Sequence, residues 1–141
     1  MELTVDEMKL SANVLDAYNR HILEDKIDEH GIQIINQEEL DALKSIIALC
    51  KENNWIPIMI TTPFTSEYND YIWRESPEYM EAIYSLIYDV AEETGVEYFD
   101  YSRDARFCSN HNLFLDGDHL NKEGGRLFVD VINDEVIKKI K

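Results

Sequence analysis

The stretch "WIPIMITTP", residues 55–63, is the part of the sequence that decides the fold. It is a continuous apolar run that begins after two asparagines and ends at a proline, and it is too short for a helix. Such a run is typical of a strand buried on both faces of a parallel sheet, because helices then cover both sides. The turn "TTPF", residues 61–64, marks the carboxyl end of this predicted strand.

Helical patterns precede the strand. Thr4 and Glu7 fit a capping box, and apolar residues recur at helical spacing through the first thirty residues. Asn36 can cap a further helix that runs to about residue 54. The apolar stripe of that helix is formed by Leu40, Leu43, Ile47 and Cys50.

A second strand and two more helices follow. Ser76 and Pro77 begin a helix, and Gly95 stands where a C-terminal cap belongs. "VEYFD", residues 96–100, predicts a strand, and a long loop leads from it to a final apolar-faced helix around residues 127–136. This alternation predicts an α/β fold with a parallel sheet.

The chain of 141 residues is long enough for one domain. We divide that domain into a helical N-terminal segment, residues 1–35, and an α/β portion, residues 36–141. The α/β portion is helix-rich and predicts part of a three-layer α/β/α, flavodoxin-like fold. Two strands cannot bury the faces and edges of a sheet, so we expect the uncovered edge to promote self-association as a homo-oligomer.

Composition excludes several classes of function. A net charge of -16 argues against nucleic acid or an anionic membrane surface as a partner, since both attract clustered Lys and Arg. The sequence as written has no signal peptide and no apolar run long enough to span a membrane, which predicts a cytoplasmic location. Cys50 and Cys108 have no CxxC spacing and are expected to be free thiols. Three arginines near the C-terminus either offset nearby aspartates, the interpretation we favour, or attract an anionic substrate: Arg103, Arg106 and Arg126.

The stretch "LFLDGDHLNKEGGRLF", residues 113–128, carries the candidate chemistry. A histidine three residues after an aspartate can donate its Nδ1 proton to that carboxylate, which leaves Nε2 to act as a base. Asp116 and His119 have this spacing, and Asp118 does not. Asn121 predicts the cap of the final helix, and Gly124 and Gly125 would let the helix start lie close to neighbouring backbone.

Two other interpretations of this stretch stay open. The aspartates can serve as turn residues and helix N-terminal partners, with His119 a polar residue of the turn. A metal site is the other interpretation, built from Asp116, Asp118, His119 and Glu123, although the spacing matches no EF-hand loop. Our prediction is a site that uses neither metal nor cofactor.

The order of these elements, and the string "DGDHLN" above all, resembles the C-terminal part of the SGNH hydrolases, the GDSL-type esterases. The resemblance covers roughly residues 37–140. In that family the last block reads D-x-x-H-L-N, followed within a few residues by glycine, and its Asp and His complete a catalytic triad. The resemblance implies that Asp116 orients His119 and that His119 is the general base of an ester-hydrolysing or acyl-transferring site. It implies a small-molecule or carbohydrate ester as substrate and no cofactor.

The N-terminal blocks of that family are absent from this sequence. No glycine precedes an Asp-Ser pair, and no glycine stands two residues before either "ND". Other nucleophiles were weighed and not adopted, because Ser and Thr after strands usually serve as turn or cap residues and nothing suggests a lowered thiol pKa: Thr61, Thr62, Thr65, Ser66, Ser102 and Cys108.

The leading hypothesis is therefore an SGNH-like C-terminal region that carries the Asp116–His119 pair, needs an N-terminal half to complete it, and is inactive alone. The alternative hypothesis is a non-catalytic α/β module that self-associates or binds a partner through its exposed sheet edge.

Overall fold

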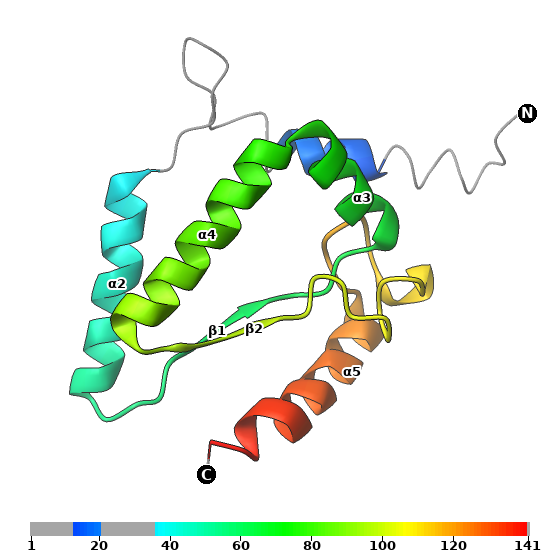
Figure 1. Cartoon of the computed structure of the whole chain (residues 1–141). Helices are drawn as coiled ribbons and strands as arrows, with labels where there is room; N and C mark the ends of the chain where they lie inside the picture. The colour runs from blue at the N-terminus through cyan, green and yellow to red at the C-terminus, as the bar shows by residue number, and fades with distance from the viewer. Residues whose placement is uncertain (1–12, 21–35, 141) are drawn as a thin grey trace, which may run out of the picture.

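A computed structural model describes residues 13–20 and 36–140 of the chain. Residues 13–20 are helical and precede, in order, α2 (Gln37–Glu52), β1 (Ile58–Thr61), α3 (Ser66–Glu75), α4 (Pro77–Thr94), β2 (Glu97–Asp100), the 3-10 turn η2 (His111–Leu113), α5 (Lys122–Ile132) and the π-turn η3 (Asn133–Ile137). Figure 1 shows this order as a helix-rich α/β arrangement, which confirms the predicted fold class. The predicted capping box of Thr4 and Glu7 lies outside the described residues.

Helix ends follow the predicted caps. The side chain of Asn36 accepts a hydrogen bond from the Glu38 N–H and begins α2. Gly95 ends α4 with a left-handed backbone, φ 66°, a conformation that costs other residues steric strain. These short-range interactions set the start of α2 and the end of α4, whereas Ser76 precedes α4 without a side-chain capping bond.

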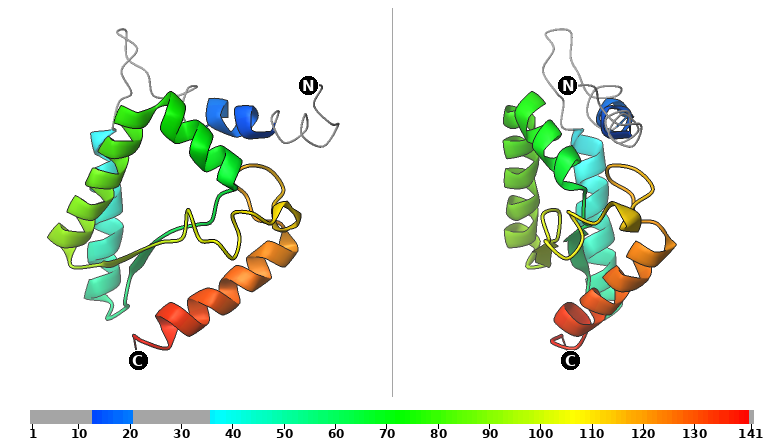
Figure 2. Two further views of the ribbon diagram at one scale, coloured as in Figure 1. Left: turned by 45° about the vertical axis from the view of Figure 1, so that its right-hand side comes forward. Right: turned by 90° about the vertical axis from the view of Figure 1, so that its right-hand side faces the viewer.

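The sheet lies between two helical layers. β1 and β2 pair in parallel, with Ile58 opposite Glu97, and within the described residues the sheet consists of these two strands. Ile58 and Ile60 pack into the core cluster that contains α5, whereas Met59 packs against Ile47 of α2 and Val90 of α4. Because strand side chains alternate between faces, α5 covers one face and α2 with α4 the other (Figures 1 and 2).

The prediction of a strand buried on both faces is wrong for the first half of "WIPIMITTP". Trp55 and Ile56 are each 67% exposed, and the strand itself, Ile58–Thr61, is half-buried. Leu43, expected in the α2 core stripe, is 40% exposed. A two-stranded sheet offers too little surface to cover the whole apolar run and the whole stripe of α2.

α3 is an element that the sequence analysis did not predict. Thr65, directly after the "TTPF" turn, accepts a hydrogen bond from the Tyr68 N–H and caps this helix. α3 forms a core cluster with the helical segment of residues 13–20 and the start of α4, whose buried members are Val14, Ala17, Tyr18, Tyr68, Ile72 and Met80. The N-terminal segment therefore lies against α3, close to the carboxyl ends of the strands (Figure 1).

Among the described helices, none has the length and apolar character to cross a lipid bilayer.

Candidate active site

The candidate residues lie in a closed loop between η2 and α5, which we call the site loop, residues 113–121. Phe114 and Leu120 form an antiparallel bridge across its base. The Leu115 N–H donates to the His119 carbonyl at 2.8 Å, and the Asn121 N–H donates to the Leu113 carbonyl at 2.8 Å. These bonds fix the backbone on both sides of the DGDH turn.

α3 anchors the tip of the site loop. The backbone N–H and the hydroxyl of Thr65 both donate to the Gly117 carbonyl, at 2.9 and 3.1 Å. Gly117 lies against the Tyr68 side chain so closely that an added Cβ would be 3.1 Å from the Tyr68 Cβ. A larger residue here would push against Tyr68, so glycine favours the close approach, and the loop sits next to the "TTPF" turn as predicted.

The start of α5 anchors the other end. The Asn121 side chain accepts hydrogen bonds from the Glu123 and Gly124 N–H groups, which confirms the predicted cap. A Cβ on Gly124 would lie 2.2 Å from the Leu113 carbonyl oxygen, whereas one on Gly125 would meet nothing within 4 Å. The predicted close approach is thus confirmed for Gly124 and wrong for Gly125.

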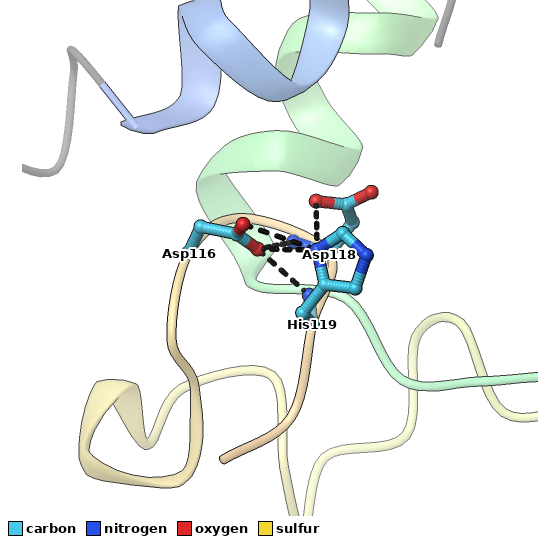
Figure 3. Close-up of side chains that lie close together, drawn as sticks. All are labelled: Asp116, Asp118 and His119. Carbon is cyan, nitrogen blue, oxygen red and sulfur yellow. Dashed lines mark hydrogen bonds and ion pairs between the residues drawn. The ribbon is translucent and has the colours of Figure 1, made fainter. Parts of the chain in front are cut away.

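Asp116 and His119 are hydrogen-bonded to each other, as their spacing predicted. His119 Nδ1 lies 2.9 Å from Asp116 Oδ1 and 3.0 Å from Oδ2, and the His119 N–H donates to Oδ1 at 2.9 Å (Figure 3). The Asp116 side chain is largely buried, and that of His119 is half exposed. An aspartate that holds one ring nitrogen of a half-exposed histidine has the geometry of an orienting carboxylate and a general base.

Asp118 also contacts the histidine ring, a contact that the sequence analysis missed. Its Oδ1 lies 3.2 Å from His119 Nδ1 (Figure 3). The Asp118 N–H donates to Asp116 Oδ1 at 3.2 Å, so the chain turns back after Asp116 and returns Asp118 to the ring. The D-x-D spacing, typical of such a turn, was the available signal. Because ionised carboxylates only accept hydrogen bonds, Nδ1 must carry the proton.

Hydrogen bonds keep Asp116 ionised. Partial burial acts to raise the pKa of its carboxyl group, but the Asp118 N–H and the His119 ring outweigh burial and lower the pKa to about 2. Burial raises the pKa of the Tyr68 hydroxyl beneath the loop, and the Asp118 carboxylate adds to that increase. At neutral pH the loop therefore presents an anionic Asp116 above a neutral phenol.

Arg20, in the N-terminal helical segment, reaches the same carboxylate. Its Nη2 lies 3.3 Å from Asp116 Oδ2, and its Nε donates to Asp16 at 3.0 Å. The sequence analysis did not identify Arg20, because the contact joins residues 96 positions apart and no local pattern encodes it.

Three of the residues proposed as metal ligands lie close together. Ligand atoms of Asp116, Asp118 and His119 lie within 4.8 Å of one another, and Glu123 is not part of this group. The ring nitrogen nearest the carboxylates is Nδ1, and a cation held by these three residues would need this same nitrogen without its proton. The donor chemistry therefore favours an orienting pair over a metal site.

Four of the six other candidate nucleophiles, Thr61, Thr65, Ser102 and Cys108, have structural roles. Ser102 is 2% exposed and its hydroxyl accepts a hydrogen bond from Tyr84 at 3.0 Å. Cys108 is a buried free thiol whose pKa burial raises, which disfavours the reactive thiolate. Thr65 holds the site loop through Gly117, and Thr61 is hydrogen-bonded to Tyr98 at 2.7 Å.

For two of the three arginines, Arg103 and Arg106, the structure confirms the interpretation favoured from sequence, that they offset acidic neighbours. Arg103 pairs with Asp70 at 3.5 Å. Arg106 pairs with Glu135 at 2.5 Å and also with Asp104.

Comparison with known proteins identifies one family. Residues 6–131 match the model of the family described as "DltD protein", which is one of the SGNH hydrolase-like families. The match includes the N-terminal helical segment, which lay outside the resemblance seen from sequence. Neither the comparison with curated proteins nor that with solved structures returned a match. Because the family model covers most of the sequence, and the site loop lies within it, the chain belongs to the DltD family.

Proposed function

We propose that this chain carries the Asp–His part of an SGNH-like acyl-transfer site that acts in D-alanylation, on an ester-linked D-alanyl group. Membership of the DltD family supports the reaction class and the D-alanyl group. The observation that carries the proposal is the hydrogen bond between His119 Nδ1 and Asp116 on an anchored loop.

In the proposed reaction His119 is the general base and Asp116 the residue that orients it. Nε2 accepts the proton of an attacking hydroxyl while the hydroxyl oxygen bonds to the ester carbonyl carbon. The imidazolium, stabilised by Asp116, returns that proton to the leaving alkoxide as the original C–O bond breaks. Asp116 suits this role because its lowered pKa keeps it anionic at neutral pH.

We further propose that the nucleophile and the oxyanion donors come from outside this chain. The hydroxyls and the thiol discussed above are committed to buried structural contacts, and the sequence holds no G-D-S block. An acyl-transfer site needs nucleophile, base and oxyanion donors together, so this chain should not hydrolyse esters by itself.

The test compares the chain with two histidine variants on nitrophenyl acetate and on a nitrophenyl ester of D-alanine. His111, which pairs with Glu67 at 2.9 Å, provides the matched control as an exposed histidine of an adjacent turn. We expect wild type, His119→Ala and His111→Ala to react at the same slow rate, comparable to free imidazole. A fast reaction abolished by His119→Ala alone would mean that a nucleophile resides in this chain, with Ser66, Ser102 and Cys108 to be substituted next.

A second candidate function, self-association, is favoured by exposed apolar residues of α2 and of the segment between α2 and β1. We call this group the α2 face; its members Ile46, Leu49, Trp55 and Ile56 are 57–67% exposed. Isolated apolar residues are common at surfaces, but four within eleven positions, beside a two-stranded sheet with open edges, are typical of an interface. We propose that copies of the chain pair through this face.

Sedimentation tests this second candidate. We expect wild type to self-associate at high concentration and Trp55→Glu to be monomeric. Val129→Glu is the control, because Val129 is 63% exposed on α5, in the opposite helical layer. A stable monomeric wild type at high concentration would contradict the candidate.

A further inference from the structure

The carboxylate of Asp116 is held through both of its oxygens. Oδ1 accepts the backbone N–H groups of Asp118 and His119, at 3.2 and 2.9 Å. Oδ2 receives Nη2 of Arg20 at 3.3 Å, from a different part of the chain. The ring nitrogen of His119 lies between the two oxygens, at 2.9 and 3.0 Å. The orientation of Asp116 therefore depends on its own turn and on Arg20.

Arg20 comes from a packed helical segment, which limits the positions its guanidinium can reach. Ala17 and Tyr18 of this segment are buried, and the Tyr18 hydroxyl lies 2.7 Å from the Ser76 hydroxyl. The Tyr18 ring packs edge-to-face on Tyr71 of α3, with centroids 5.0 Å apart. Figure 3 shows the segment directly above the site loop. A side chain whose helix is fixed in this way loses less entropy in its contact than a free surface arginine.

The charge of Arg20 matters because two carboxylates approach the same ring nitrogen. Asp116 and Asp118 both place a carboxylate oxygen within 3.2 Å of His119 Nδ1. A general base must be neutral when its substrate arrives. A guanidinium on the far oxygen of Asp116 carries positive charge, so it disfavours a second positive charge on the ring. It still leaves the Nδ1 hydrogen bond to Asp116 in place.

We infer that Arg20 is a positioning residue for His119 that acts through Asp116: it holds the carboxylate in the plane that the ring needs and offsets the negative charge beside it. This inference rests on the proposed function, since a positioning residue has meaning only if His119 serves as a base. The charged and titratable groups near the pair include Asp16 from the helical segment, Tyr68 from α3 and Asp118 from the loop.

The experiment follows the titration of the His119 ring by NMR in the full chain. Removing the positive charge in Arg20→Gln should move the midpoint of that titration to higher pH, by about half a unit or more for a partly exposed pair. Arg20→Lys keeps the charge and should move it less. Asp16→Asn is the matched control, because it removes the other carboxylate that Arg20 contacts.

Action through Asp116 is tested by a double-mutant cycle. If Arg20 acts through that carboxylate, Arg20→Gln should move the midpoint by less than half as much in an Asp116→Asn background. Backbone amide spectra and urea unfolding show whether each variant keeps its fold, and Arg20→Lys serves as the second variant if Arg20→Gln does not.

No change of midpoint in folded Arg20→Gln, or an equal change in the Asp116→Asn background, would overturn the inference. These outcomes are distinct from failure of the proposed function, because the titration is measured without substrate. Ester hydrolysis by wild type would contradict the proposal that the nucleophile lies outside this chain. It would leave the effect of Arg20 on the His119 titration unchanged.

Discussion

The site loop and the α2 face lie in one small molecule, yet their surroundings differ. The site loop, residues 113–121, is closed on itself, hydrogen-bonded to Thr65 and seated on Tyr68. On the α2 face, Trp55 and Ile56 are 67% exposed, and β1 has β2 as its one pairing strand among the described residues.

This difference shows which part of the molecule is preorganised. Loops at protein surfaces are usually mobile. The site loop differs, because the cap residue of a neighbouring helix donates hydrogen bonds to it and its glycine lies against that helix, and these contacts fix its backbone. A fixed backbone is what a catalytic pair requires, because small displacements of a base are costly. The side chains of the α2 face are instead 57–67% exposed, which is the observation behind the proposed self-association.

Substitution of Gly124 should have the largest effect, because it should separate the site loop from the start of α5. In Gly124→Ala the new Cβ would lie 2.2 Å from the Leu113 carbonyl oxygen, so backbone must move and the loop must leave the start of α5. We expect a loss of at least about 3 kcal/mol in the free energy of unfolding, measured in urea. The control is Gly125→Ala, where no atom lies within 4 Å. That change should stabilise the helix by about 0.5 to 1 kcal/mol, and equal losses in both variants would contradict the close contact.

Removal of the Thr65 hydroxyl should also weaken the site loop, but with a smaller loss in the free energy of unfolding. Thr65→Val keeps the shape of the side chain but removes both the cap of α3 and the hydroxyl bond to the Gly117 carbonyl. We expect a loss of about 1 to 2 kcal/mol by urea unfolding. Thr65→Ser retains the hydroxyl and should recover most of the difference. Thr65→Val as stable as wild type would show that the hydroxyl bonds of Thr65 do not hold the loop.

Acid should weaken the site loop through Asp116. The folded pKa of about 2 lies below the ordinary value of 3.8, so the folded state binds protons less readily than the unfolded chain. The stability gained from Asp116 is therefore fully present above about pH 4 and is lost as the pH falls toward 2. Urea unfolding at several values in this range should show a shallower pH dependence in Asp116→Asn. Identical slopes would indicate that Asp116 is not stabilised in the folded state.

The local features of this molecule could be predicted from its sequence. Asn36, Gly95 and Asn121 cap helices where short-range patterns placed them. The Asp116–His119 hydrogen bond followed from a three-residue spacing, and its place beside the "TTPF" turn followed from the rule that strand carboxyl ends share one edge. Each of these predictions depends on residues near one another in the chain or on a general rule of sheet topology.

Features that depend on long-range packing were missed. The contact of Arg20 with Asp116 exists because the N-terminal segment packs on α3, and no periodicity in either segment encodes that packing. The exposure of Trp55 was missed because an apolar run does not reveal how many strands and helices will surround it. α3 was a different kind of error: Thr65 was expected to be a turn or cap residue, but no helix was predicted after it, although Tyr68, Tyr71 and Ile72 follow at helical spacing.

The tautomer of His119 is the most direct test of the central claim, that Asp116 orients this ring as a base. Long-range nitrogen–proton NMR correlation on chain with labelled histidine, recorded above the pH at which the ring titrates, identifies which nitrogen carries the proton. We predict a proton on Nδ1, held by Asp116 at 2.9 Å, and a loss of this preference in Asp116→Asn. A proton on Nε2 in the wild-type chain would contradict the hydrogen bond and with it the assignment of His119 as the base.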